Sequence, residues 1–132
     1  EHQSREPDRP PGTLRALSLG FSESNPEMAF LYRQFMRLNP KHEPDFLAVP
    51  PGYRGSTHKR LTDSEVPILY IVGDEDALIA PKTIEIAASL VPQSRLITMQ
   101  GAGHSVYYEQ PNAFNDHVHQ FLTEAMPPDV EV

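Results

Sequence analysis

An aspartate and a histidine each follow an apolar run in the second half of the chain. Asp76 lies four residues after the run that ends at Val72, and His104 lies five residues after the run that ends at Met99. If the two runs are parallel strands, both side chains lie at the carboxyl-terminal edge of one sheet, where functional groups of open α/β sheets collect. A histidine oriented by a carboxylate is the base that activates a nucleophile in covalent catalysis.

Glycines accompany both turns. Gly73 directly follows the first run, and Gly101 and Gly103 precede His104. Because glycine adopts backbone angles that other residues resist, we expect sharp turns at both places. The pattern therefore predicts two tight loops that present side chains at one edge of a sheet.

Each of these residues also has a simpler interpretation. Aspartate is common in turns, so Asp76 could simply be a turn residue. Asp74 and Glu75 are neighbouring carboxylates, and Asp76 is ranked above them by its spacing alone. A single histidine such as His104 is more often an ordinary surface or core residue than a base. The two positions together, in the same strand-and-turn frame, favour a catalytic pair.

The elements around the pair follow from hydrophobic patterns. Residues 66–72 and 95–99 predict strands, and the first is apolar enough to be buried on both faces of a parallel sheet. Prolines open the helices predicted over 81–91 and 111–126. Alternating strands and helices with short connections predict a parallel sheet of the α/β class.

The first half has a different character. Residues 1–60 carry nine Lys/Arg and seven Asp/Glu, whereas residues 61–132 carry two and eleven. Ser24 and Glu27 form a capping-box pattern, so we expect a helix from there to Asn39. Its apolar positions recur at helical spacing: Met28, Leu31, Tyr32, Phe35 and Leu38. Residues 13–21 fit a short helix or a strand, and residues 40–65 predict a long connection.

The second half resembles the C-terminal portion of the α/β-hydrolase superfamily. The shared features are a Gly-x-x-Asp turn followed by a helix that proline opens, then Gly-His-x-x-x-x-Glu-x-Pro-x-x-Phe. The matching residues are Gly73, Asp76, Pro81, Gly103, His104, Glu109, Pro111 and Phe114. The resemblance covers residues 66–125, and it implies that Asp76 is the triad acid and His104 the general base.

The resemblance also implies a Gly-x-Ser-x-Gly nucleophile turn and an oxyanion hole upstream. The nearest match is Gly-Phe-Ser-Glu-Ser at residues 20–24, which makes Ser22 a candidate nucleophile. Glu23 would repel the negative charge that develops beside it, and Ser22 lies only 54 residues before Asp76. We therefore expect the nucleophile upstream or on a companion chain.

The expected organisation has four parts. Residues 1–12 form an extended or disordered lead-in, and residues 13–60 form a cap-like helical segment and linker. Residues 61–126 are the C-terminal part of the hydrolase core, and residues 127–132 are a tail.

The implied reaction is hydrolysis of an ester, amide, lactone or carbon–carbon bond in a small-molecule substrate, with no cofactor. The alternative is a hydrolase-like binding or scaffold module without activity. Within the resemblance, Glu109 is expected to bond the backbone near a helix start or the His104 loop. Tyr107 and Tyr108 are expected to pack, or to touch a substrate.

Composition excludes several other classes. A net charge of −7 argues against a nucleic-acid partner, and the absence of cysteine excludes disulfides and thiolate chemistry. No apolar run approaches the length of a membrane span and no signal-peptide pattern is visible, so we expect a soluble, cytoplasmic protein. His117 and His119 point to different sides of a helix, which argues against a shared metal ion.

Overall fold

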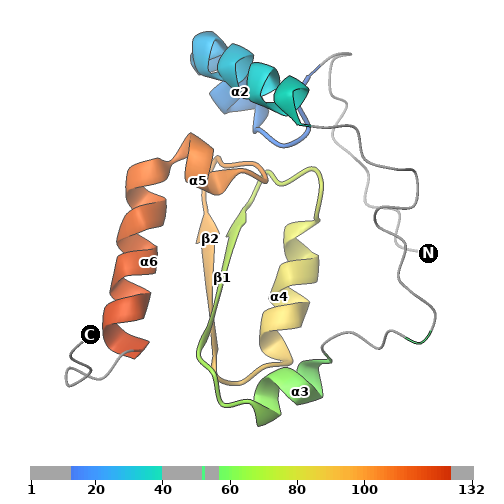
Figure 1. Cartoon of the computed structure of the whole chain (residues 1–132), viewed down its shortest axis with the longest axis vertical. Coiled ribbons are helices and arrows are strands. Elements are labelled where there is room, and N and C mark those ends of the chain that lie inside the picture. The colour runs from blue at the N-terminus through green and yellow to red at the C-terminus, as the bar shows by residue number, and fades with distance from the viewer. Residues whose placement is uncertain (1–12, 40–51, 53–56, 126–132) are drawn as a thin grey trace.

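The computed structural model describes residues 13–39, 52 and 57–125. Within them lie two strands and six helices (Figure 1). In chain order they are α1 (Leu19–Ser24), α2 (Pro26–Leu38), α3 (His58–Asp63), β1 (Ile68–Gly73), α4 (Pro81–Ser89), β2 (Ser94–Met99), α5 (Val106–Glu109) and α6 (Pro111–Ala125). The predicted lead-in (1–12) and tail (127–132) lie outside the described residues.

The two strands pair in parallel, as the sequence predicts. Their register aligns Ile68 with Ser94 at one end and Gly73 with Met99 at the other. Helix α4 connects them, so β1, α4 and β2 form a βαβ unit. The strand predicted from Val66 begins two residues later, because Val66 and Pro67 precede the paired segment.

Helices cover the sheet from both sides. Figure 1 shows α4 and α6 on opposite sides of the two strands, with α5 joining the end of the sheet to α6. The residues of the apolar cluster come from β2, the turn after it and α5, and α6 packs against them. They are Met99, Ala102 and Val106, with Ile71, Ile97, Ala113 and Phe114 against them. The cluster's three buried members, Met99, Ala102 and Val106, come from the end of β2, from the turn that carries His104 and from the start of α5, so the cluster adjoins that turn.

The expectation that β1 is buried along its whole length is wrong. Only Val72 and Gly73, at its carboxyl end, are buried, and the preceding residues are half-buried. Within the described chain each strand has one neighbour, so its other edge is not covered by a further strand. Burial is therefore deepest at the end that carries the candidate site.

The first half of the chain differs from the prediction in its details. Ser24 is the last residue of α1 and does not cap α2, whose N-cap is Asn25. Ser18 caps α1, with its hydroxyl accepting a hydrogen bond from the Phe21 amide. Helix α3 occupies part of the connection predicted over 40–65, where Thr57 supplies the N-cap. These short helices depend on capping side chains, which hydrophobic periodicity does not detect.

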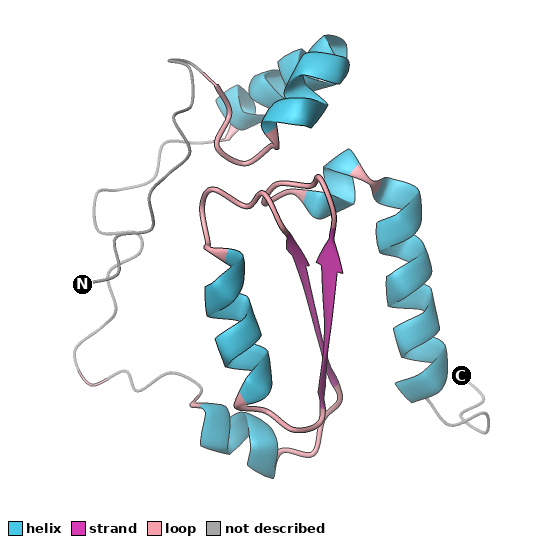
Figure 2. Ribbon diagram, turned by 180° about the vertical axis from the view of Figure 1, so that it is seen from behind, coloured by secondary structure: helices cyan, strands magenta, loops and turns pink. Residues whose placement is uncertain are grey.

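Helices α1 and α2 lie over the carboxyl-terminal ends of the strands. Figure 2 shows both strand arrows pointing toward this pair of helices. Hydrogen bonds join the two parts: the Ser105 amide donates to the Ala16 carbonyl (2.9 Å), and the Tyr108 hydroxyl donates to the Met28 carbonyl (2.8 Å). Residues 13–39, the described first part of the segment predicted as cap-like, thus lie over the edge where the candidate residues lie.

None of the helices in the part of the chain that the structure describes is long and apolar enough to cross a membrane.

Candidate active site

The two turns leave the sheet at the same level, because Gly73 and Met99 are register partners. A Cβ atom on Gly73 would lie 2.1 Å from the Ala102 carbonyl oxygen and 2.2 Å from that of Gly103. Glycine is thus required at position 73 for the close approach of the second turn, rather than for the sharp bend that the sequence suggests. At Gly101 the backbone does adopt a positive φ of 67°, which glycine tolerates best.

The first two acids of the Asp74-Glu75-Asp76 series hold the turns together. The Asp74 carboxylate accepts a hydrogen bond from the Gly101 amide (2.7 Å), and the Asp74 amide donates to the Met99 carbonyl (3.1 Å). The Glu75 amide donates to the Ala102 carbonyl (2.9 Å). These bonds fix one turn against the other at residues that precede Asp76 and His104.

Asp76 reaches His104 directly. Its Oδ2 lies 2.8 Å from His104 Nδ1, while its Oδ1 accepts hydrogen bonds from the amides of Leu78 (2.8 Å) and Ile79 (2.9 Å). The Asp76 side chain is only 5% exposed and that of His104 is 39% exposed. A shielded carboxylate, fixed by its own loop, thus holds a histidine that solvent or a ligand can reach.

This geometry sets the chemistry that the imidazole can perform. A carboxylate accepts hydrogen bonds only, so Asp76 favours the tautomer with the proton on Nδ1. Nε2 then carries the free lone pair, and the described residues offer it no hydrogen-bond partner. An imidazole in this state can accept a proton at Nε2, and Asp76 stabilises the positive charge that results.

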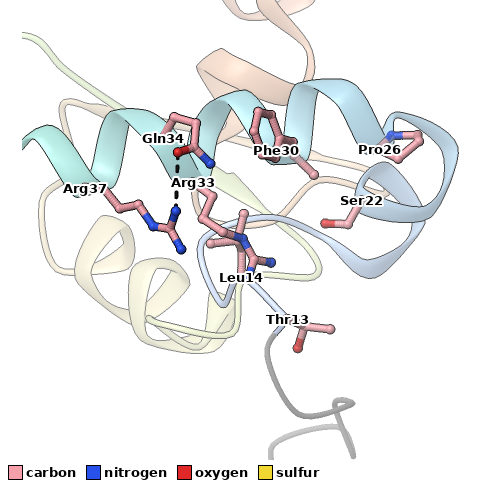
Figure 3. A pocket seen from close by; sticks show the side chains of 9 residues that line it. Thr13, Leu14, Ser22, Pro26, Phe30, Arg33, Gln34 and Arg37 are labelled. Atoms are coloured by element: carbon pink, nitrogen blue, oxygen red, sulfur yellow. Dashed lines mark hydrogen bonds between the residues drawn. The ribbon is translucent and has the colours of Figure 1, made fainter.

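Ser22, the candidate nucleophile, lies in a different setting. It is inside α1 rather than at a turn between a strand and a helix, and its hydroxyl donates to the Ser18 carbonyl (2.9 Å). It lines a cavity of about 470 Å³ together with residues of α2, among them Phe30 and Arg33 (Figure 3). His104 does not line this cavity, and among the described residues no hydrogen bond joins Ser22 to His104.

Glu109 and the two tyrosines beside it have clear contacts. The prediction that Glu109 bonds the His104 loop is confirmed, because its Oε1 accepts from the Gly103 amide (2.9 Å). Tyr108 packs edge-on against Tyr32, with ring centroids 5.0 Å apart, whereas Tyr107 is 55% exposed. Both tyrosines line a smaller cavity of about 240 Å³ between α2 and α5.

One contact near the site had no signal in the sequence. The Tyr32 hydroxyl lies 2.7 Å from the buried hydroxyl of Ser105, the residue after His104. Burial raises the pKa of Tyr32, and this effect outweighs the hydrogen bond with Ser105, which acts in the opposite direction. Helical spacing marks Tyr32 as apolar packing and gives no hint of its polar contact.

No metal centre is evident in the described part of the chain, which holds no group of three or more His, Cys, Asp or Glu side chains placed to bind an ion. His117 is half-buried and His119 is exposed on α6.

Comparison with known proteins identifies the family. The model of the Abhydrolase_4 family, described as TAP-like protein, matches residues 47–132, which is more than half of the chain. The chain belongs to this family. Its fold is therefore the C-terminal portion of an α/β-hydrolase, as the resemblance in the sequence indicates.

Individual relatives in the superfamily have several activities. A Bacillus subtilis protein described as a candidate 2-succinyl-6-hydroxy-2,4-cyclohexadiene-1-carboxylate synthase is 35% identical over 72 residues, covering 54% of this chain and 26% of the relative. The pimeloyl-[acyl-carrier protein] methyl ester esterase of Xylella fastidiosa is 28% identical over 91 residues, covering 64% and 36%. The chain thus spans about a quarter to a third of the length of these relatives.

A solved structure matches over most of the chain. A thermophilic esterase from Thermogutta terrifontis aligns with a TM-score of 0.71 and 25% identity, covering 86% of this chain and 42% of the esterase. This chain therefore matches less than half of the esterase's length.

Proposed function

We propose that this chain supplies the acid and the base of a nucleophile–His–Asp triad in a hydrolase, with Asp76 as the acid and His104 as the base. The observation that carries the proposal is the 2.8 Å contact between Asp76 Oδ2 and His104 Nδ1, at the carboxyl-terminal edge of two parallel strands. Functional groups of open α/β sheets collect at this edge.

The roles follow from the geometry. His104 Nε2 takes the proton of the attacking nucleophile and later returns it to the leaving group. Asp76 keeps the proton on Nδ1 and stabilises the imidazolium ion. Its second oxygen, bound to the amides of Leu78 and Ile79, prevents the carboxylate from rotating away from the imidazole.

The nucleophile and the oxyanion hole are assigned to polypeptide outside this chain. Ser22 is a poor alternative, because its hydroxyl is bonded within α1 and its cavity does not include His104. The relatives are about three to four times longer than the region they share with this chain, so their length leaves room for both features upstream. A separate companion chain is the second possible source.

An ester is our first choice of substrate. Two of the three relatives described above are esterases, one for the methyl ester of an acyl-carrier-bound substrate. Amide, lactone and carbon–carbon bonds use the same Asp–His pair and are the further classes to be assayed.

The test is made in the complete enzyme that contains this chain. We expect His104→Ala to lower kcat on short nitrophenyl esters by roughly 10⁶-fold, as the loss of a triad histidine does elsewhere. The matched control is His119→Ala, which changes an exposed histidine of α6 and leaves kcat unchanged. If His104→Ala retained more than about a tenth of the activity, His104 would not be the base. If the wild-type enzyme hydrolysed none of the four substrate classes (ester, amide, lactone and carbon–carbon bond), a binding module without activity would be favoured.

A further inference from the structure

We infer that Glu109 is the positioning residue of the site, and that it fixes the His104 turn by anchoring it to the segment before α1. The inference goes beyond the proposed Asp76–His104 pair, on which its kinetic test rests. Glu109 is 8% exposed, and the proposed reaction gives its carboxylate no role.

Three hydrogen bonds converge on this carboxylate. Oε1 accepts from the amides of Gly103 (2.9 Å) and Ser18 (3.1 Å), and Oε2 accepts from the Ser18 hydroxyl (2.7 Å). Gly103 directly precedes His104, whereas Ser18 is 91 residues away from Glu109 in the sequence. A single side chain therefore joins the base-bearing turn to the start of the cap-like segment.

The space around the turn shows how closely the two parts fit. A Cβ atom on Gly103 would lie 2.5 Å from the Ser18 amide nitrogen and 2.7 Å from the Leu17 carbonyl carbon. On the other side of His104, the Ser105 amide donates to the Ala16 carbonyl. The backbone on both sides of His104 is thus held by residues 16–18, and Glu109 supplies the charged part of that connection.

The carboxylate acts through geometry rather than through contact with a substrate. Without this carboxylate, three buried hydrogen-bond donors lose their acceptor, which costs free energy. The protein can reduce this cost most easily if the turn shifts so that the donors find other partners. A displacement of about 1 Å at a catalytic group can lower the rate by about 100-fold. Glutamine keeps the shape, because its carbonyl oxygen can accept from both amides and its NH₂ group can donate to the Ser18 hydroxyl.

The experiment compares Glu109→Ala, Glu109→Gln and Ser18→Ala in the complete enzyme, with Glu23→Ala as the control. Glu23 is an exposed glutamate of the same N-terminal segment. We expect Glu109→Ala to lower kcat per folded molecule by about 100-fold with little change in KM, and glutamine to restore most of the loss. Ser18→Ala, which removes one of the three bonds, should cause a smaller fall in kcat, and Glu23→Ala none.

A second measurement does not depend on activity. The ¹⁵N-edited NMR signal of the His104 ring reports the proton shared with Asp76, and we expect it to be retained in Glu109→Gln and lost or broadened in Glu109→Ala. If that signal and kcat per folded molecule both stay at their wild-type values, Glu109 is merely structural and the inference is wrong. Should Glu109→Ala fail to fold, Ser18→Ala decides by the same two criteria. If kcat were unaffected by His104→Ala, the proposed base would be refuted. The NMR signal of His104 in the Glu109 variants would still test whether Glu109 positions the turn.

Discussion

The turn region after the two strands and the neighbouring helix α2 are held in place in opposite ways. In the turn region, Ala102, Gly103 and Ser105 are buried, and backbone and carboxylate hydrogen bonds connect one turn with the other. Helix α2 has no buried residue. Six of its apolar side chains are at least 40% exposed: Met28, Phe30, Leu31, Phe35, Met36 and Leu38.

The difference shows where the proposed chemistry gets its precision. The Asp76–His104 geometry is built from contacts between adjacent turns, so it is determined by the βαβ unit and the segment that Glu109 anchors. The Tyr32 hydroxyl joins α2 to Ser105, the N-cap of α5, and the Tyr108 hydroxyl joins α5 to α2. Because stability is not uniform across a structure, substitutions should have large effects at the turns and small effects on α2.

After the loss of His104 itself, the largest effect is expected for the acid. In the complete enzyme, Asp76→Asn should lower kcat by about 10⁴-fold without unfolding the protein, because an amide favours the wrong tautomer and cannot stabilise the imidazolium ion. Glu75→Gln and Asp74→Asn should be milder, although Asp74→Asn weakens the bond to the Gly101 amide. Steady-state kinetics with circular dichroism make the comparison. If Asp74→Asn had the largest effect, the acid would be misassigned by two residues.

A steric substitution should break the turn region through its packing. Gly73→Ala places a Cβ atom against the carbonyls of Ala102 and Gly103, and we expect it to lower the free energy of unfolding by about 3 kcal/mol. Gly20→Ala is the matched control, since its site is helical and a Cβ there meets nothing within 4 Å apart from its chain neighbours and the backbone of its own helix. The control should be neutral or slightly stabilising. Equal midpoints of urea unfolding for the two variants would show that the turns adjust freely.

The contact between the two regions should have an intermediate effect. Tyr32→Phe removes the partner of the buried Ser105 hydroxyl, at a cost of about 1 kcal/mol in unfolding free energy. Since burial raises the pKa of Tyr32 above its ordinary 10.0, the unfolded chain loses this proton first, and stability falls as pH rises above that value. Tyr32→Phe should lack this part of the pH dependence. Urea unfolding across alkaline pH measures it, with Tyr70→Phe as the control.

The smallest effect is expected at the exposed end of α2. Leu38 is 79% exposed, so Leu38→Ser should change the free energy of unfolding by no more than about 0.5 kcal/mol. Val91→Ala, at a position that is 1% exposed, should cost several times more. A large loss from Leu38→Ser would mean that α2 is covered by another surface under the conditions of the measurement.

The parts of the fold that sequence reasoning found are those with a strong local signal. Apolar runs and prolines indicated both strands, α4 and α6, and the glycine turns placed Asp76 and His104 at one edge. The helix predicted from Ser24 was found with its start displaced by about a residue. The capping of α1 by Ser18 and the presence of α3 were not found, because single capping side chains decide them.

The contacts between distant segments could not be predicted. The resemblance singled out Glu109 and suggested a bond to the backbone near a helix start or to the His104 loop. Its other partner, Ser18, belongs to a segment with no recognisable motif. The same holds for Tyr32 and Ser105. Sequence periodicity reports which face of an element is apolar, whereas these pairs depend on how two elements are docked.

The two oxygens of the Asp76 carboxylate have different hydrogen-bond partners, and this restricts which acids can replace it. One oxygen holds the loop through Leu78 and Ile79, and the other holds His104. Glutamate is one methylene longer, so it could keep its loop bonds or its imidazole bond but not both. We therefore expect an exchange of one acid for the other to need a simultaneous change in the length or shape of the 73–80 loop.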